Sequence, residues 1–175
     1  MLAVASSDPV MSVLGPIGLA AAVGTALVVD MGVGLHLPRS RTLADIASDG
    51  PRLEELAPGR PGVAFVSAGG LAADSARPLV HRIARHWPAV VVRAGPSGWD
   101  GPTAPLFPLY PGWLAPDHGG AAVWQRVPGG SNPPGPGPVL PSLRRAATDR
   151  MLRGGLPRVD RWVRAWREVW TLPWA

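Results

Sequence analysis

The chain has no cysteine and no lysine, and its 175 residues include one asparagine and one glutamine. The lack of cysteine excludes disulfide bonds, thiol nucleophiles and cysteine-based zinc sites. All 17 basic residues are arginine, so chemistry that needs an ammonium side chain has no residue to supply it. Hydrophobic residues make up 46% of the chain, which is enough to form a packed core.

The charge of the chain is concentrated in its last fifth. Residues 1–141 hold nine arginines and nine acidic residues, which gives no net charge. Residues 142–175 hold eight arginines and three acidic residues, so this segment accounts for the whole formal charge of +5. Such an excess predicts an acidic protein partner, an anionic membrane or nucleic acid as the partner of the C-terminal segment.

Predicted strands and helices alternate over the first 93 residues. Apolar runs without an alternating polar face are typical of central parallel strands, and capping signals at Asp8 and Thr42 mark helix starts. The predicted strands are Leu2–Ser6, Thr25–Asp30, Val63–Ser67 and Ala89–Val92. The predicted helices are Ser12–Val23, Leu43–Ala47, Leu53–Leu56 and Pro78–Trp87. This order predicts an α/β fold, with a parallel sheet and helices on both of its faces.

The second half of the chain is richer in proline and glycine. Leu106–Tyr110 and Ala121–Arg126 are expected to be edge strands, because prolines are poorly tolerated in the middle of a sheet. Residues 128–138 are nearly all proline or glycine, which is typical of a linker. We therefore predict an α/β domain at 1–127, a linker at 128–141 and a basic helical tail at 142–175.

The predicted tail contains two helices, Ser142–Arg153 and Arg158–Trp170, and the second has tryptophan and valine on one face and arginine on the other. Docking onto the chain's own domain, a protein partner and an anionic membrane surface all remain open for this helix. Nucleic acid is less favoured, because the tryptophans lie opposite the arginines. The predicted contact residues are Arg161, Trp162, Arg164, Trp166, Arg167 and Trp170.

A membrane span over residues 10–29 is an alternative, since this stretch is uncharged and long enough to cross a bilayer. Glycines and a proline inside the run favour a core helix followed by a strand. The N-terminus lacks a basic residue and carries Asp8, so no secretory signal is expected. We predict a cytoplasmic protein, with peripheral association at the inner face of the membrane left open.

Five segments resemble the MinD/ParA family of P-loop ATPases over residues 2–98. They are Leu19–Ala22 at a helix end, Asp30 after a strand, Thr42–Ile46 in a "TLxDI" segment, Val66–Gly69 and the apolar strand Val90–Arg93. The resemblance implies a P-loop NTPase-like fold and a role in division-site, chromosome or pilus positioning, with a homodimer left open. The same pattern is shared by other α/β folds.

The chain departs from this family at both parts of the catalytic site, the phosphate loop and the metal-side aspartate. A phosphate loop needs glycines and a lysine, whereas residues 6–12 have neither and instead contain Asp8 and Pro9. Arg93 stands where the family has a metal-side aspartate. We therefore expect a non-catalytic protein with no cofactor, although weak nucleotide binding stays open. Asp30 and Arg93 are predicted to shape the residual site, and an ion pair between them is the alternative.

Three other functions remain as alternatives or are disfavoured. An active ATPase with an unusual phosphate loop and a membrane-anchored protein both stay open. A serine hydrolase is disfavoured, because Gly95–Gly98 is followed by Trp99 and not by the second glycine of a nucleophile elbow. No metal site is predicted, because the histidines lack ligand spacing; they are His36, His81, His86 and His118.

Overall fold

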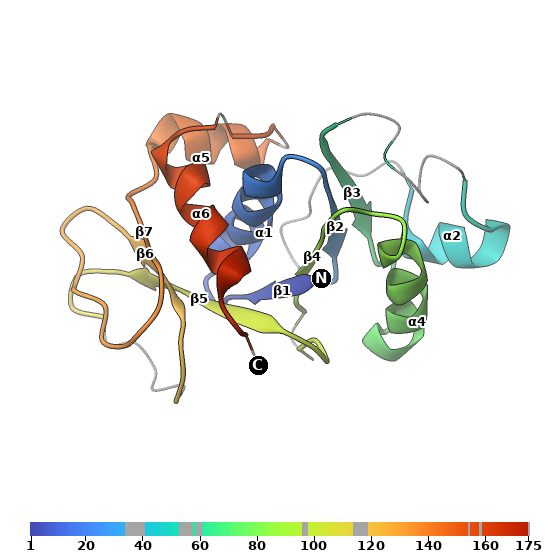
Figure 1. The fold of residues 1–175 in the computed structure, drawn as a ribbon, viewed down its shortest axis with the longest axis horizontal. Helices are drawn as coiled ribbons and strands as arrows, with labels where there is room; N and C mark the ends of the chain where they lie inside the picture. Colours follow the sequence, from blue (N-terminus) through green and yellow to red (C-terminus); the bar gives the residue numbers. More distant parts are fainter. Residues whose placement is uncertain are drawn as a thin grey trace.

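A computed structural model describes residues 1–33, 41–52, 58, 61–95, 98–113, 119–153, 155–157 and 159–174. Its centre is a seven-stranded sheet in the order β3-β2-β4-β1-β5-β6-β7, in which all neighbouring strands run parallel (Figure 1). The strands are β1 (Leu2–Ala5), β2 (Ala26–Asp30), β3 (Val63–Ser67), β4 (Val90–Arg93), β5 (Thr103–Leu109), β6 (Val123–Arg126) and β7 (Val139–Leu140). The helices are α1 (Pro9–Val23), α2 (Leu43–Asp49), α4 (Ala73–Ala84), α5 (Arg145–Leu152) and α6 (Arg161–Thr171). The predicted α/β fold is confirmed.

Helices cover both faces of the sheet. Alternate residues of a strand point to opposite faces, and Leu2 and Val4 of β1 pack in one core cluster while Ala3 packs in the other. The first cluster contains side chains of α1, α5 and α6, and the second contains side chains of α2 and α4. Figure 1 accordingly shows α5 and α6 beside α1, apart from α2 and α4.

The capping signals at Asp8 and Thr42 are confirmed, although α1 begins at Pro9 and not at the predicted Ser12. Asp8 caps α1, and Thr42 caps α2 through a reciprocal pair of hydrogen bonds with Asp45. Helix α4 differs from the prediction, because it begins at Ala73 and contains Pro78 in its interior. A proline there removes one helical hydrogen bond, but the helix buries an apolar face against the sheet, and such packing supplies most helix stability. The predicted helix Leu53–Leu56 lies outside the described residues.

The prediction of edge strands for β5 and β6 is wrong, because both lie inside the sheet. Strand β5 pairs with β1 over Thr103–Pro105 and with β6 over Leu106–Leu109. Each half of β5 therefore has a partner on one side only. A proline can be accommodated where its missing N–H faces no neighbouring strand. Because β1 and β6 pair with different halves of β5, Pro105 and Pro108 can both occupy such positions.

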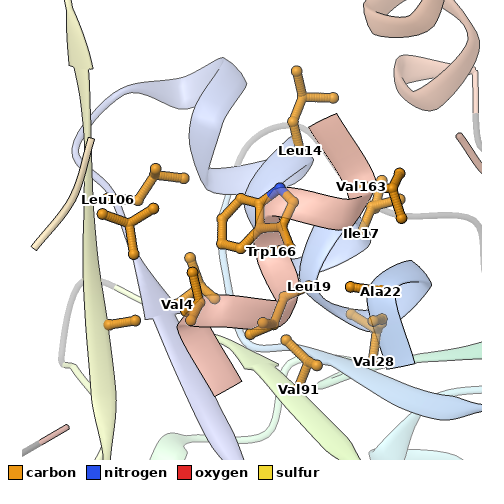
Figure 2. Close-up of a cluster of buried hydrophobic side chains, with 14 of the residues drawn as sticks. Val4, Leu14, Ile17, Leu19, Ala22, Val28, Val91, Leu106, Val163 and Trp166 are labelled. Carbon is orange, nitrogen blue, oxygen red and sulfur yellow. The ribbon is translucent and has the colours of Figure 1, made fainter. Parts of the chain in front are cut away.

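The C-terminal segment belongs to the main core. Strand β7 lies within the predicted linker and pairs with β6, and α6 packs against α1. Figure 2 shows the ring of Trp166 surrounded by apolar side chains, including Leu14 and Ile17 of α1 and Leu106 of β5. Docking onto the chain's own domain, one of the roles left open for α6, is therefore what the structure shows.

The alternative of a membrane span at residues 10–29 is not supported. This stretch is divided between α1 and β2, and Gly24 ends α1 between them. Within the described ranges, no helix combines the length and the apolar character that crossing a bilayer requires.

Candidate functional site

Strands β1, β2 and β4 end side by side at the carboxyl edge of the sheet, where α/β proteins usually bind ligands. The register places Arg93 opposite Asp30 and next to Val4. The side chains of Arg93 and Asp30 form a buried ion pair, with Nη1 of Arg93 donating to Oδ1 of Asp30 at 3.1 Å. The two residues predicted to shape the residual site therefore come together, and they bind each other.

The guanidinium of Arg93 has further partners at this edge. Its Nη2 donates to Oγ of Ser12 in α1 at 3.2 Å and to the carbonyl of Val33 at 3.1 Å. A Cβ on Gly32 would lie 2.4 Å from Cζ of Arg93, so Gly32 leaves room for this side chain. Arg93 thus ties β2, β4 and α1 together, which gives this cation a structural role.

The N-terminus of α1 is closed by the chain's own carboxylate. Oδ1 of Asp8 accepts the backbone N–H groups of Val10 and Met11 at 3.0 and 2.8 Å. The N–H of Ser12 donates to the carbonyl of Asp8, and Pro9 has no N–H to offer. A helix N-terminus is a common anion site because its first amides are unpaired. Here the first turn of α1 has no amide left for a phosphate.

Tyr110, which follows β5, holds the second oxygen of the same carboxylate. Its hydroxyl donates to Oδ2 of Asp8 at 2.8 Å. Tyr110 is 41% exposed, so its desolvation is only partial; this partial burial, together with the hydrogen bond and the negative charge of Asp8, raises the pKa of Tyr110 to about 12. Both oxygens of the Asp8 carboxylate are therefore engaged, and the residue is fixed at the N-terminus of α1.

A pocket of about 720 Å³ opens beside these residues at the carboxyl edge. Its polar lining consists of three serines, backbone atoms and Arg93, and its wall includes Phe107. The described residues that line it include no carboxylate, and Arg93, the one cation among them, is already bound to Asp30. These residues therefore offer no unpaired charge for general acid–base chemistry or for neutralising a triphosphate.

The predicted contact residues of α6 do not form one surface. Trp162 and Trp166 are buried, 3% and 0% exposed, so the prediction that they contact an external partner is corrected. Both rings pack on α1, because Gly18 leaves space for them. Trp170 is half-buried and donates through Nε1 to the carbonyl of Leu19. The sequence shows the apolar face but not its partner in α1.

The arginines of α6 are exposed, and two of them line a groove. Arg161 and Arg164 line a groove of about 970 Å³ together with Arg126 and Arg144, while Arg167 lies outside it. Sequence reasoning missed Arg126 and Arg144. The excess of arginine after residue 141 was the available signal, but it does not indicate that Arg126, at the end of β6, joins the group.

The other predicted features contribute no site within the described ranges. His81 stacks on Trp99 at a ring separation of 6.2 Å, and no three histidine or acidic side chains of the described residues lie together as metal ligands would. His36, His118 and Ser97 lie outside the described residues.

Comparison with known proteins leaves the family open. No protein-family model matches the chain, and no curated protein matches it either.

Proposed function

We propose that this chain is a non-catalytic MinD/ParA-like protein, a pseudo-ATPase that acts by binding a partner in division-site, chromosome or pilus positioning. The observation that carries the proposal is the occupation of both parts of the expected catalytic site by the chain's own side chains. Asp8 satisfies the first amides of α1, and Arg93 is bound to Asp30 where the family has a metal-side aspartate. Among the described residues, neither part of the expected catalytic site offers a free charged side chain to a triphosphate or its metal.

Electrostatics support the absence of ATP hydrolysis. A triphosphate that approached the N-terminus of α1 would meet the Asp8 carboxylate, a like charge, and would have to displace it from two hydrogen bonds. The lack of lysine removes the cation that usually reaches the phosphates in this class of site. Weak nucleotide binding in the 720 Å³ pocket is compatible with the proposal, because binding there does not require transfer of a phosphoryl group.

The test is a nucleotide titration of the full chain with ATP and magnesium, together with a measurement of phosphate release. We expect no release above that of a heat-denatured sample. The variant Asp8→Asn keeps a capping oxygen but removes the charge, so it should bind ATP more tightly than the parent if the carboxylate repels phosphate. Magnesium-dependent hydrolysis by the parent chain would make it a working ATPase with an unusual loop and overturn the proposal.

The partner-binding half of the proposal rests on the exposed arginines of the C-terminal segment. An acidic protein partner and an anionic membrane surface are the two classes that this charge favours. Deletion of residues 142–175 is not a suitable test, because α6 fills part of the core. Vesicle co-sedimentation of the parent chain and of variants with exposed arginines replaced by glutamine avoids this problem. Sedimentation that depends on anionic lipid and on these arginines would identify the membrane as the partner.

A further inference from the structure

The arginine-lined groove joins three separate parts of the fold. Arg126 ends β6, Arg144 precedes α5, and Arg161 and Arg164 lie on successive turns of α6. Residues this far apart in the chain meet only because α6 packs beside the carboxyl end of β6 and β7. The groove has a volume of about 970 Å³, and it is distinct from the pocket beside Arg93.

The four guanidinium groups that line the groove have no acidic partner in the part of the chain that the structure describes. Among the described residues, no carboxylate forms an ion pair with Arg126, Arg144, Arg161 or Arg164. Asp160, which also lines the groove, accepts the backbone amides at the start of α6 through Oδ1. Four cations and one carboxylate leave this groove with a net charge of +3, which strongly favours a ligand with several negative charges.

The backbone around the groove is held by a buried hydrogen-bond network. Nε1 of Trp162 donates to Oε1 of Gln125 at 2.7 Å, and Nε2 of Gln125 donates to the carbonyls of Arg126 and Pro141, each at 2.8 Å. Gln125 is 1% exposed. This network connects α6 to β6 and to the end of β7, so the backbone that carries Arg126, Arg161 and Arg164 is held in place. A preorganised site loses less conformational entropy when it binds a ligand.

We propose that this groove binds an acidic, extended peptide segment of a partner protein. The inference deepens the proposed function, on which it rests for the view that the chain acts by binding. The four arginines are exposed and come from three separate segments of the chain, and a ligand with several carboxylates can pair with more of them than an anion with a single charge can. Guanidinium groups form paired hydrogen bonds with carboxylates, and Val139, Pro141 and Ala165 supply apolar contacts.

Two other polyanions fit the groove less well. Single-stranded nucleic acid is held by bases stacked on exposed aromatic rings, and the one aromatic residue in the lining, Trp162, is buried. An amphipathic helix at a membrane inserts its apolar face among the lipids, and the apolar face of α6 is already packed on α1. A concave surface with apolar patches between cations is better matched by a peptide.

The test is fluorescence anisotropy of a labelled peptide of alternating glutamate and leucine, titrated with the full chain. The variants Arg126→Gln/Arg164→Gln and Arg144→Gln/Arg161→Gln remove half of the groove cations each. We expect each double variant to weaken peptide binding by about tenfold or more, because each loses two cations that pair with carboxylates. A tenfold change in the dissociation constant corresponds to about 1.4 kcal/mol. Arg167→Gln is the matched control, because Arg167 is exposed on the same helix but outside the groove. It should change the dissociation constant by less than about twofold, since surface charges contribute little individually.

Other results of the binding experiment would overturn the proposal or identify a different ligand. Equal weakening by Arg167→Gln would show general charge attraction and overturn the proposal, as would a peptide that does not bind the parent chain. A single-stranded oligonucleotide or an anionic vesicle that binds more tightly than the peptide, with the same dependence on the groove arginines, would replace the peptide as the ligand. Urea unfolding of every variant verifies that the exposed substitutions leave the fold intact. ATP hydrolysis by the parent chain would overturn the proposed function and leave a positive peptide result standing.

Discussion

Gly18 in α1 and Trp162 in α6 are packed so closely that a Cβ on Gly18 would lie 2.4 Å from Cη2 of Trp162. The same Cβ would lie 2.4 Å from Nε1 of Trp166. One turn earlier, a Cβ on Gly15 would meet the side chain of Leu106. Gly18 therefore leaves a notch in α1 into which the indole rings of Trp162 and Trp166 fit, while Gly15 lets α1 pack closely on Leu106 of β5.

The substitution Gly18→Ala is expected to destabilise the protein by about 1–3 kcal/mol, the usual cost of overpacking a core. Alanine is the better helix former, so propensity alone would predict the opposite sign. The control is Gly120→Ala, because a Cβ at Gly120 would meet nothing within 4 Å. The measurement is the free energy of unfolding in urea. A Gly18→Ala protein as stable as the parent would mean that α6 is not seated in the notch.

Trp162 and Trp166 offer a matched pair of substitutions within the same helix face. Nε1 of Trp162 donates to buried Gln125, whereas Nε1 of Trp166 has no acceptor among the described residues. Replacement by phenylalanine removes the same volume at both positions. Trp162→Phe also leaves the buried amide oxygen without its donor, so it should cost about 1–3 kcal/mol more than Trp166→Phe. Urea unfolding measures both, and equal losses would argue against the Trp162–Gln125 bond.

The elements that could be predicted from sequence are those whose signals are local. Apolar runs located β1 to β4, and the capping residues Asp8 and Thr42 marked two helix starts. What could not be predicted depends on contacts between distant segments. The interior position of β5 depends on its pairing with β1 over one half and with β6 over the other. The apolar face of α6 is buried because its indole rings pack on Gly18, which lies more than a hundred residues away in the sequence.

The same distinction applies to the candidate site. Asp30 and Arg93 were predicted together, because the carboxyl ends of neighbouring parallel strands meet at one edge. Arg126 was missed, because nothing near it in the sequence marks it as part of a basic surface. Its place in the groove follows from the packing of α6 beside β6, and that packing is a tertiary property.

Tyr110, the one tyrosine of the chain, is expected to ionise late. Its pKa is raised from 10.0 to about 12, first by burial and then by the hydrogen bond to Asp8 and the charge of that carboxylate. A raised pKa in the folded state means that the contribution of this group to stability is complete below pH 10. That contribution declines as the pH rises from 10 to about 12.

Tyrosinate absorbance measures this titration directly. The variant Asp8→Asn removes the charge and should lower the pKa of Tyr110 toward 10, although burial keeps it above that value. A pKa of Tyr110 that does not differ between the parent and Asp8→Asn would contradict the contact between the hydroxyl and the carboxylate. The result also bears on the closed end of α1, because the same carboxylate satisfies its first amides.

Substitution of Arg93 tests whether the buried ion pair between Asp30 and Arg93 contributes to the stability of the protein. Arg93→Met keeps much of the side-chain volume but removes the cation beside Asp30, whose side chain is 1% exposed. Loss of one partner of a buried pair typically costs about 3–5 kcal/mol, because the remaining charge stays in a medium of low polarity. We expect a loss of this size in urea unfolding at neutral pH.

The double variant Asp30→Asn/Arg93→Met distinguishes a lost attraction from a stranded charge. Asparagine keeps an oxygen that can accept the backbone N–H of Gly32, as Oδ1 of Asp30 does at 3.0 Å, but it carries no charge. If the cost of Arg93→Met comes mainly from the carboxylate left beside an apolar side chain, the double variant should be more stable than the single one. If the double variant is the less stable of the two, the carboxylate of Asp30 stabilises this edge of the sheet even without Arg93, through bonds such as the one it accepts from the backbone N–H of Gly32. The charge of Asp30 would then be a structural feature in its own right and not only the counter-ion of Arg93.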